Sequence, residues 1–229
     1  MVSIKEYWDK KFSDKSKIWG DEPSGAARKL LHFFQIHNIR KAEILDLACG
    51  YGRDTVFFFK NGYQIKGIDI SSVAIDIVKE SFSGKIEFIV GDLMEMPFAP
   101  GSFDVVFGNF ILHLFSFALR QKMLKECHRV LKQGGLAVFS VASVDDPDYG
   151  TGQEVEKDCF VNSRGVAKFY YSKESVNKEF TLFEVMEIMD IEEFHEHDSP
   201  HTHKSYLIIA KKSGINPNIQ GTLYLRSQE

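Results

Sequence analysis

The sequence predicts a single α/β domain built on a mostly parallel β-sheet. Between residues 43 and 142, short β-type runs alternate with segments of helical periodicity, which is the pattern of parallel strands joined by crossover helices. Of the 229 residues, 44% are hydrophobic and 26% are charged, so the chain has enough apolar material for one core. Two further β-type runs near the C-terminus are separated by a short turn, and such neighbours normally pair antiparallel.

Local patterns set the expected elements. Asn61 and Gly62 are expected to end the first crossover helix, because glycine readily adopts the left-handed conformation that closes a helix. Ser71 and Ser72 can cap the second helix, and Ser172 opens a short one. The expected strands are 43–48, 63–69, 85–90, 103–108 and 136–142, with a helix at 117–132 that ends at Gly134–Gly135 and a hairpin formed by 182–194 and 204–211.

Three segments lie outside this alternation. Residues 1–42 precede the first strand and are expected to form a helical lid region. Residues 145–171 begin with turn residues and acids and then show no clear period, which predicts an inserted loop or lid. A single domain is therefore expected over residues 1–212, followed by a tail at 213–229.

Charge and composition exclude several classes of function. The net charge of −4 leaves no basic surplus for nucleic acid, and the longest apolar run, 105–115, is too short to span a bilayer. The charged N-terminus lacks the apolar stretch of a secretory signal, and the three cysteines form no CxxC pair. We therefore expect a cytoplasmic protein that binds neither nucleic acid nor a membrane. It is also expected to be a monomer or homodimer.

Acidic residues and glycines follow the predicted strands, where open parallel sheets bind their ligands. Residues 46–53 read Asp-Leu-Ala-Cys-Gly-Tyr-Gly-Arg, a turn that is either an ordinary tight connection or a place where the backbone approaches a ligand. Asp69 ends the second strand, where a carboxylate can accept both hydroxyls of an adenosine ribose. Asp92 ends the third and is either a solvated loop acid or an acceptor for the adenine amine.

Together these segments resemble the successive motifs of class I S-adenosylmethionine-dependent methyltransferases. The matching motifs, in the order and spacing of that family, are residues 44–52, 67–71, 91–93, 103–106 and 129–135. The resemblance implies a Rossmann-like seven-stranded sheet in the order 3-2-1-4-5-7-6, with strand 7 antiparallel and helices on both faces. It also implies S-adenosylmethionine as the cofactor and methyl transfer to a small acceptor.

The resemblance further implies which residues contact the cofactor, all of them at or just after a strand end. They are Asp46 beneath the turn, Ala48, Cys49 and Gly50 against the methionine part, Asp69 on the ribose, Ile70 on the adenine, Asp92 and Leu93 at the adenine edge, and Asn109 on the passage to the substrate. The family commonly has glycine in place of Ala48, and an alanine is tolerated there if φ is negative. Cys49 could instead be a buried filler, which we favour over a nucleophile.

Aromatic residues near the N-terminus resemble a lid. Trp8 and Trp19 lie in segments 7–12 and 19–24, which are similar to the lid segments of the small-molecule branch that includes thiopurine and tellurite-resistance methyltransferases. Either tryptophan could instead pack against the sheet edge. We expect residues up to Ser24 to close over the cofactor and exclude water.

Histidines are the candidates for acid–base chemistry. A hydroxyl or amine acceptor needs a nearby base, whereas a thiolate, selenide or tellurite does not. His113 follows the fourth strand and is such a candidate, although a histidine lodged between two leucines fits equally well. The turn at 195–203 holds four histidines, and we favour a solvated turn over a metal site, so no metal is expected. His201 or His203 could instead reach toward the acceptor.

Two other functions remain open at this point. A nicotinamide-dependent (NAD) oxidoreductase shares the fold type, but its G-x-G-x-x-G fingerprint is missing, and Asp92 adds an acid that it does not require. A non-catalytic S-adenosylmethionine-binding module would be expected to lose the cofactor turn or its acids, and these are present.

Overall fold

The computed structural model describes residues 3–82, 84–163, 165–195 and 201–214. Its main sheet has seven strands in the order β3-β2-β1-β4-β5-β10-β9. Their bounds are β1 Glu43–Leu47, β2 Gln64–Asp69, β3 Glu87–Val90, β4 Phe103–Asn109, β5 Leu131–Ala142, β9 Phe183–His195 and β10 His201–Lys212. Because β10 runs antiparallel to both β5 and β9, the predicted fold class and strand order are confirmed.

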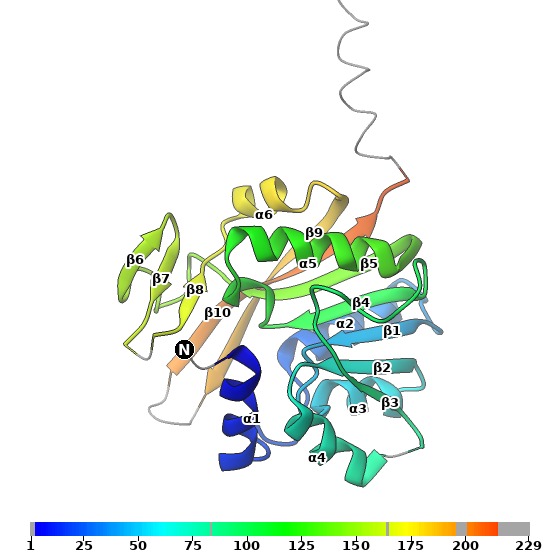
Figure 1. Ribbon diagram of the computed structural model, residues 1–229. Helices are drawn as coiled ribbons and strands as arrows, with labels where there is room; N and C mark the ends of the chain where they lie inside the picture. The colour runs from blue at the N-terminus through cyan, green and yellow to red at the C-terminus, as the bar shows by residue number, and fades with distance from the viewer. Residues whose placement is uncertain (1–2, 83, 164, 196–200, 215–229) are drawn as a thin grey trace, which may run out of the picture.

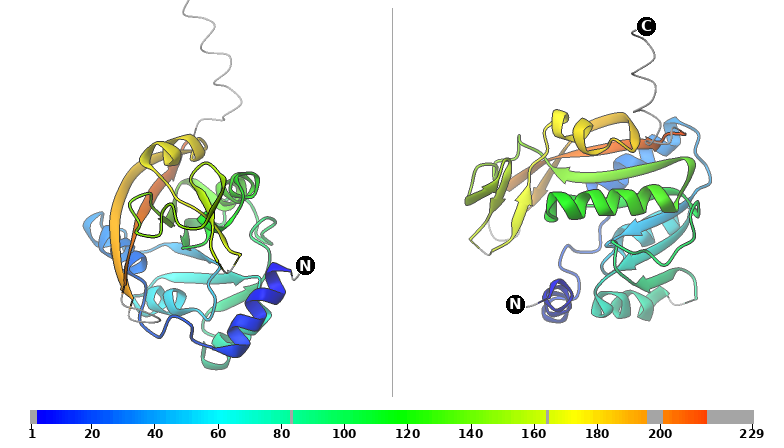
Figure 2. Two further views of the ribbon diagram at one scale, coloured as in Figure 1. Left: turned by 90° about the vertical axis from the view of Figure 1, so that its left-hand side faces the viewer. Right: turned by 45° about the horizontal axis from the view of Figure 1, so that its top comes forward.

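Helices cover both faces of this sheet, as Figures 1 and 2 show. One face packs against α2 (Gly25–Ile36), α3 (Arg53–Lys60) and α4 (Ser72–Phe82), and the other against α5 (Phe117–Val130) and α6 (Lys173–Glu179). Successive side chains of a strand point to opposite faces of the sheet, which explains why there are two hydrophobic cores. Ile44 of β1 packs in the core under α2, α3 and α4, and Leu45 packs in the core under α5 and α6.

The predicted capping residues Gly62 and Ser71 lie at helix ends, and Ser24 adds a cap that the sequence analysis did not predict. Gly62 follows α3 with φ of 89°, and Ser71 precedes α4 and accepts the N–H of Ala74. The Ser24 hydroxyl caps α2 by accepting the N–H of Ala27. The first helix, α1 (Ile4–Asp14), lies beside α4 rather than on a face of the sheet, and the Asp9 carboxylate accepts the Ser71 hydroxyl at 2.6 Å.

The largest difference from the predicted boundaries lies between α5 and β5. Helix α5 ends at Val130, and β5 begins at Leu131, because Leu131 is buried and pairs with Phe103 of β4. Gly134, expected just beyond the end of the helix, lies inside β5 with φ of 76°. The strand is therefore longer than predicted.

The segment 145–171, expected to be an inserted loop or lid, has secondary structure of its own. It contains a second, three-stranded antiparallel sheet of β6 (Gln153–Glu156), β7 (Cys159–Val161) and β8 (Ala167–Phe169). All four side chains of β6 are exposed, so no alternation of apolar and polar residues marks the strand in the sequence. Figure 1 shows this small sheet on the same side of the main sheet as α1.

Some expectations fall outside the described residues. Of the tail at 213–229, only Ser213 and Gly214 are described, and residues 196–200 of the His-rich turn are not. None of the helices in the described part of the chain combines the length and apolar character that a bilayer span requires.

Candidate cofactor and acceptor site

A cavity of about 530 Å³ opens beyond the carboxyl ends of β1, β2 and β4. With the exception of His201, all the predicted site residues line it: Trp8, Trp19, Asp46, Ala48, Cys49, Gly50, Asp69, Ile70, Asp92, Leu93, Asn109 and His113. The backbone of His201 begins β10, but its side chain lies outside what the structure describes. Strand ends thus bring together residues that are far apart in the sequence.

The turn after β1, residues 48–52, is held by the acid that ends β2. One carboxylate oxygen of Asp69 accepts the N–H of Gly50 at 2.8 Å, and the other accepts the N–H of Ser71 at 2.8 Å. Burial raises the pKa of Asp69 above its ordinary value, although both N–H groups act in the opposite direction. Asp69 therefore joins the two neighbouring strand ends, and its remaining lone pairs can accept from a ligand.

The structure corrects the expectation for Ala48. Its φ is 52°, in the left-handed region, and not the negative value under which an alanine is tolerated. This conformation costs an L-residue about 1–2 kcal/mol. Gly52 also has a positive φ of 79°, and a Cβ there would lie 2.6 Å from the Val78 side chain. The turn thus needs glycine at 52 but carries a strained alanine at 48.

Carboxylates dominate the charge of this part of the cavity. Burial and the neighbouring Asp54 raise the pKa of Asp46, whose carboxylate accepts the Thr55 hydroxyl at 2.5 Å. Asp69 and Asp92 line the same space, while Arg53 is the one guanidinium among the lining residues. An acid-rich cavity of this kind favours a ligand with positive charge.

Four aromatic side chains form a cluster over the turn. Trp19 stacks on Tyr51 with 6.2 Å between the ring centroids. The ring centroids of Trp8 and Phe12 each lie 6.1 Å from that of Trp19 and 6.0 Å from each other. The Tyr51 hydroxyl donates to the Gly20 carbonyl at 2.7 Å and accepts the N–H of Trp19 at 3.1 Å. The N-terminal segment is therefore fixed directly to the turn.

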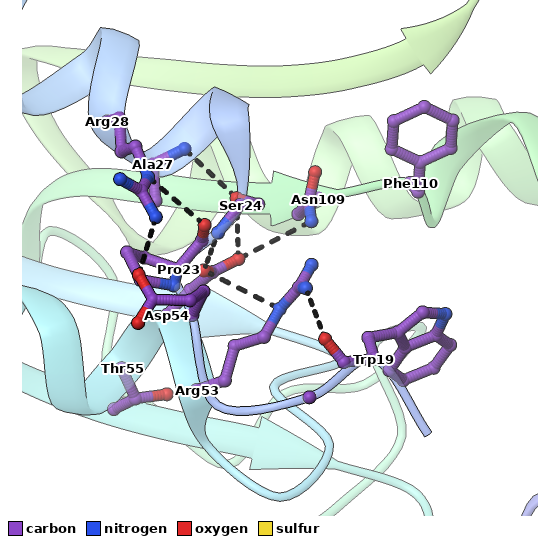
Figure 3. A network of polar contacts seen from close by, with 12 residues as sticks. Trp19, Pro23, Ser24, Ala27, Arg28, Arg53, Asp54, Thr55, Asn109 and Phe110 are labelled. Carbon is purple, nitrogen blue, oxygen red and sulfur yellow. Dashed lines mark hydrogen bonds and ion pairs between the residues drawn. The ribbon is translucent and has the colours of Figure 1, made fainter. Parts of the chain in front are cut away.

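Asp54 anchors the same segment at its other end (Figure 3). Its two carboxylate oxygens accept the backbone N–H of Ser24 at 2.7 Å and the Ser24 hydroxyl at 2.8 Å. The Asn109 amide donates to it at 3.4 Å, and Arg53 donates to the Trp19 carbonyl at 3.2 Å. The sequence analysis missed Asp54, although an acid in the first turn of the helix that follows a glycine-rich turn is a usable signal.

His113 and Cys49 have properties that limit their chemistry. His113 is buried, and this burial, together with Lys168, lowers its pKa to about 3. Its Nδ1 accepts the N–H of Ala142 at 3.4 Å, so the proton of the neutral ring is on Nε2. Such a ring is a weak base. Burial raises the pKa of the Cys49 thiol and so favours the neutral thiol over the nucleophilic thiolate. Cys49 therefore fits the role of a small side chain that fills space in the core.

The matches to known proteins agree with this geometry. Residues 44–135 match the family described as "Methyltransferase domain". This segment is a methyltransferase domain. The sequence resemblance to methyltransferases is thereby confirmed, and it includes the turn after β1, Asp69 and Asp92.

Curated relatives match this chain over part of their length. An uncharacterised methyltransferase of Synechocystis sp. is 32% identical over 105 residues, 46% of this chain and 48% of the relative. A demethylmenaquinone methyltransferase of Bacillus velezensis is 39% identical over 113 residues, 45% of this chain and 47% of the relative. The alignments thus span about half the length of these curated relatives.

The whole fold is shared more widely than the sequence. The solved structure of 1,6-didemethyltoxoflavin-N1-methyltransferase from Burkholderia thailandensis, with bound 1,6-didemethyltoxoflavin and S-adenosylhomocysteine, has a TM-score of 0.71 at 18% identity. The superposition covers 92% of this chain and 87% of that one. The likeness is one of fold, and it extends beyond the methyltransferase domain to the segments on either side.

Proposed function

We propose that the protein transfers a methyl group from S-adenosylmethionine to a small apolar acceptor. The observation that carries this proposal is the cavity at the strand ends, which combines acids with aromatic walls. S-adenosylmethionine carries a sulfonium and an ammonium group against one carboxylate, so it is a net cation. Carboxylates and aromatic faces both stabilise such a charge.

The chain's own groups would supply binding, orientation and exclusion of water. Asp69 accepts ribose hydroxyls, Asp92 and Leu93 meet the adenine edge, and the turn at 48–52 approaches the methionine part. When bound, the cofactor supplies an electrophilic methyl group, which is transferred by in-line displacement. Apolar lining residues on the other side of the cavity, Phe110, Ile111, Leu114, Phe115 and Leu119, suit an apolar acceptor.

The alternatives are less well supported. NAD carries two phosphates, which carboxylates lining the cavity, such as those of Asp54 and Asp92, would repel. A binding module without catalysis would not need the apolar space beyond the cofactor turn.

Two of the named relatives act on small molecules, demethylmenaquinone and 1,6-didemethyltoxoflavin. The three cysteines are free, which supports a reducing compartment such as the cytoplasm.

Calorimetry with S-adenosylmethionine, S-adenosylhomocysteine and NAD tests the proposed function. The first two are expected to bind and to raise the melting temperature, because a ligand that binds only the folded state stabilises it. NAD is expected to do neither. Stabilisation by NAD alone would contradict the proposal.

We also propose that residues 1–24 act as a lid over the cofactor. Trp19 contacts Tyr51, and Asp54 anchors Ser24. The Phe12 ring packs so closely over Gly50 that a Cβ on this glycine would lie 3.3 Å from it. Such a segment can open at the aromatic contacts and stay fixed at Ser24.

Limited proteolysis of this segment is expected to slow when S-adenosylhomocysteine is bound, because the ligand would hold the aromatic cluster closed. A variant without residues 1–23 should keep its fold, measured by circular dichroism, and lose turnover. Equal cleavage in both states together with full activity of the truncated variant would show that the segment is not a lid.

A further inference from the structure

The acceptor side of the cavity holds two hydrogen-bond donors from elements that are far apart in the sequence. His113 lies in the short 3-10 helix η1 (Leu112–Leu114) that follows β4, and Lys168 lies in β8. These two elements pack against each other, and both side chains line the cavity. After burial, Lys168 is the largest cause of the low pKa of His113. The two side chains therefore act on the same part of the cavity.

His113 is a donor whose proton is fixed in place. Its Nδ1 accepts the N–H of Ala142 at 3.4 Å, so the proton of the neutral ring is on Nε2, on the side of the ring away from Ala142. Because burial and Lys168 lower the pKa of the ring to about 3, the imidazole is neutral near pH 7. The side chain therefore offers the cavity an N–H that does not become a lone pair at ordinary pH.

Lys168 brings a positive charge to the same place. Its Nζ lies 5.4 Å from the centre of the Tyr170 ring, a contact that helps to hold the ammonium group in position. Asp148 lies 3.7 Å from this Nζ, which is longer than a hydrogen bond, and its side chain is 51% exposed to water. An ammonium group carries three N–H donors, so Lys168 can bind a second anion while it stays near Asp148.

The other charged groups near His113 have partners of their own. One oxygen of Asp146 pairs with Nδ1 of His203 at 3.0 Å and accepts the N–H of Lys204 at 2.9 Å. The other oxygen accepts a backbone N–H of its own loop at 2.9 Å. Arg120 donates two hydrogen bonds to Glu179. The carboxylate of Asp146 is thus compensated by donors around it.

The cavity is therefore polarised from one side to the other. Asp46, Asp69 and Asp92 lie at the strand ends, where the cofactor is expected, and the two donors lie on the side of the apolar residues of η1 and α5. Low-dielectric surroundings strengthen the attraction between a donor and a negative charge. The acceptor side suits an apolar molecule that carries one negatively charged oxygen.

We propose that His113 and Lys168 bind the acceptor as an anion, through an ionised oxygen on an apolar molecule. The inference rests on the proposed function and deepens it, because it assigns the class of acceptor: an aryl oxide or an enolate. A free aryl hydroxyl has a pKa of about 10, so only about one molecule in a thousand is ionised at pH 7. Donors that bind the ionised form raise this fraction about tenfold for each unit by which they lower that pKa.

With an ionised acceptor, the transfer needs no side-chain base. The acceptor releases its proton to water on binding, and its oxygen then forms a bond to the methyl carbon. The bond between that carbon and sulfur breaks, and its electron pair stays on sulfur. An anion and a sulfonium cation thus become a neutral methyl ether and a neutral thioether. Because charge disappears from both reactants, apolar walls around them favour the step.

The absorbance of 4-nitrophenol, which is yellow only when ionised, tests this binding without turnover. With the protein saturated by S-adenosylhomocysteine, the bound phenol is expected to have a pKa at least about one unit below that of the free phenol, which means that the ionised form binds about tenfold tighter. Lys168→Met should remove most of this shift, and Lys168→Arg, which keeps the charge, should retain it. Lys157→Met, an exposed lysine between β6 and β7, is the control. A phenol that does not bind, an unshifted pKa, or the same shift in Lys168→Met would overturn the proposal.

Two variants of His113 and a neutral probe separate binding of the anion from a structural role. His113→Gln keeps a side-chain N–H and should keep most of the shift, whereas His113→Leu should bind the ionised phenol about tenfold more weakly or less tightly still. The neutral 4-nitroaniline, which has nearly the same shape, should bind to the wild type and to Lys168→Met with the same affinity. An equal loss of both probes in Lys168→Met would overturn the proposal. Loss of S-adenosylhomocysteine binding in the wild type would instead contradict the proposed function.

Discussion

Replacing Glu179 with alanine is expected to lower the free energy of unfolding by about 3–5 kcal/mol, because the buried Arg120 would lose its buried carboxylate partner and keep only the Phe115 carbonyl at 2.8 Å and the more exposed Glu156 at 3.7 Å. Glu179 accepts Nε of Arg120 at 3.0 Å and Nη2 at 2.7 Å, and also the Tyr171 hydroxyl at 2.9 Å. The guanidinium of Arg120, 1% exposed, also lies 3.9 Å from the centre of the Phe169 ring. This cluster joins α5, α6 and the end of the segment 145–171.

Urea unfolding followed by circular dichroism measures the change. Glu184→Ala, an exposed acid on β9, is the matched control and should change stability by no more than about 0.5 kcal/mol. The double variant Arg120→Met and Glu179→Leu should recover much of the loss, since apolar residues can replace a buried ion pair. A loss below about 1 kcal/mol in Glu179→Ala would mean that water or another group compensates for the charge.

Asp69→Ala is expected to weaken the affinity for S-adenosylhomocysteine by about 1–3 kcal/mol, which is about 5- to 150-fold. Part of the effect would come from lost acceptors for the ribose hydroxyls. Part would come from the turn itself, because Asp69 also accepts the N–H groups of Gly50 and Ser71. The variant is expected to stay folded.

Asp69→Asn separates the two contributions, because it keeps the shape and one oxygen acceptor but loses the charge. Calorimetry should place its affinity between those of the wild type and the alanine variant. Asp76→Ala, an exposed acid on α4, is the control and should bind like the wild type. Unchanged affinity in Asp69→Ala would mean that the ribose binds elsewhere.

The sequence predicted the features that follow from local pattern. The meeting of Asp46, Asp69 and Asp92 at one cavity follows from parallel strands that end at a common edge. The order of the sheet was instead implied by the resemblance to class I methyltransferases. The contacts of the three acids with a cofactor stay a prediction. The pairing of Asp146 with His203 could not be found in this way, because it joins two segments 57 residues apart, and only the antiparallel position of β10 brings them together.

Conformation was harder to foresee than position. The left-handed Ala48 depends on the closure of the whole turn, and an alanine alone gives no sign of it. The small sheet of β6 to β8 was not predicted, because β6 is exposed along its whole length and β7 and β8 are only three residues each, too short to show an apolar alternation.

The division of the cavity between two parts of the chain has a consequence for how such a protein can evolve. The residues predicted to hold the cofactor lie within 44–135, whereas Trp8, Trp19, Lys168 and His203 come from outside it. Substitutions in these outer segments can exchange one acceptor for another and leave the residues predicted to hold the cofactor unchanged. Descendants of one gene could thus acquire different substrates while continuing to use the same methyl donor.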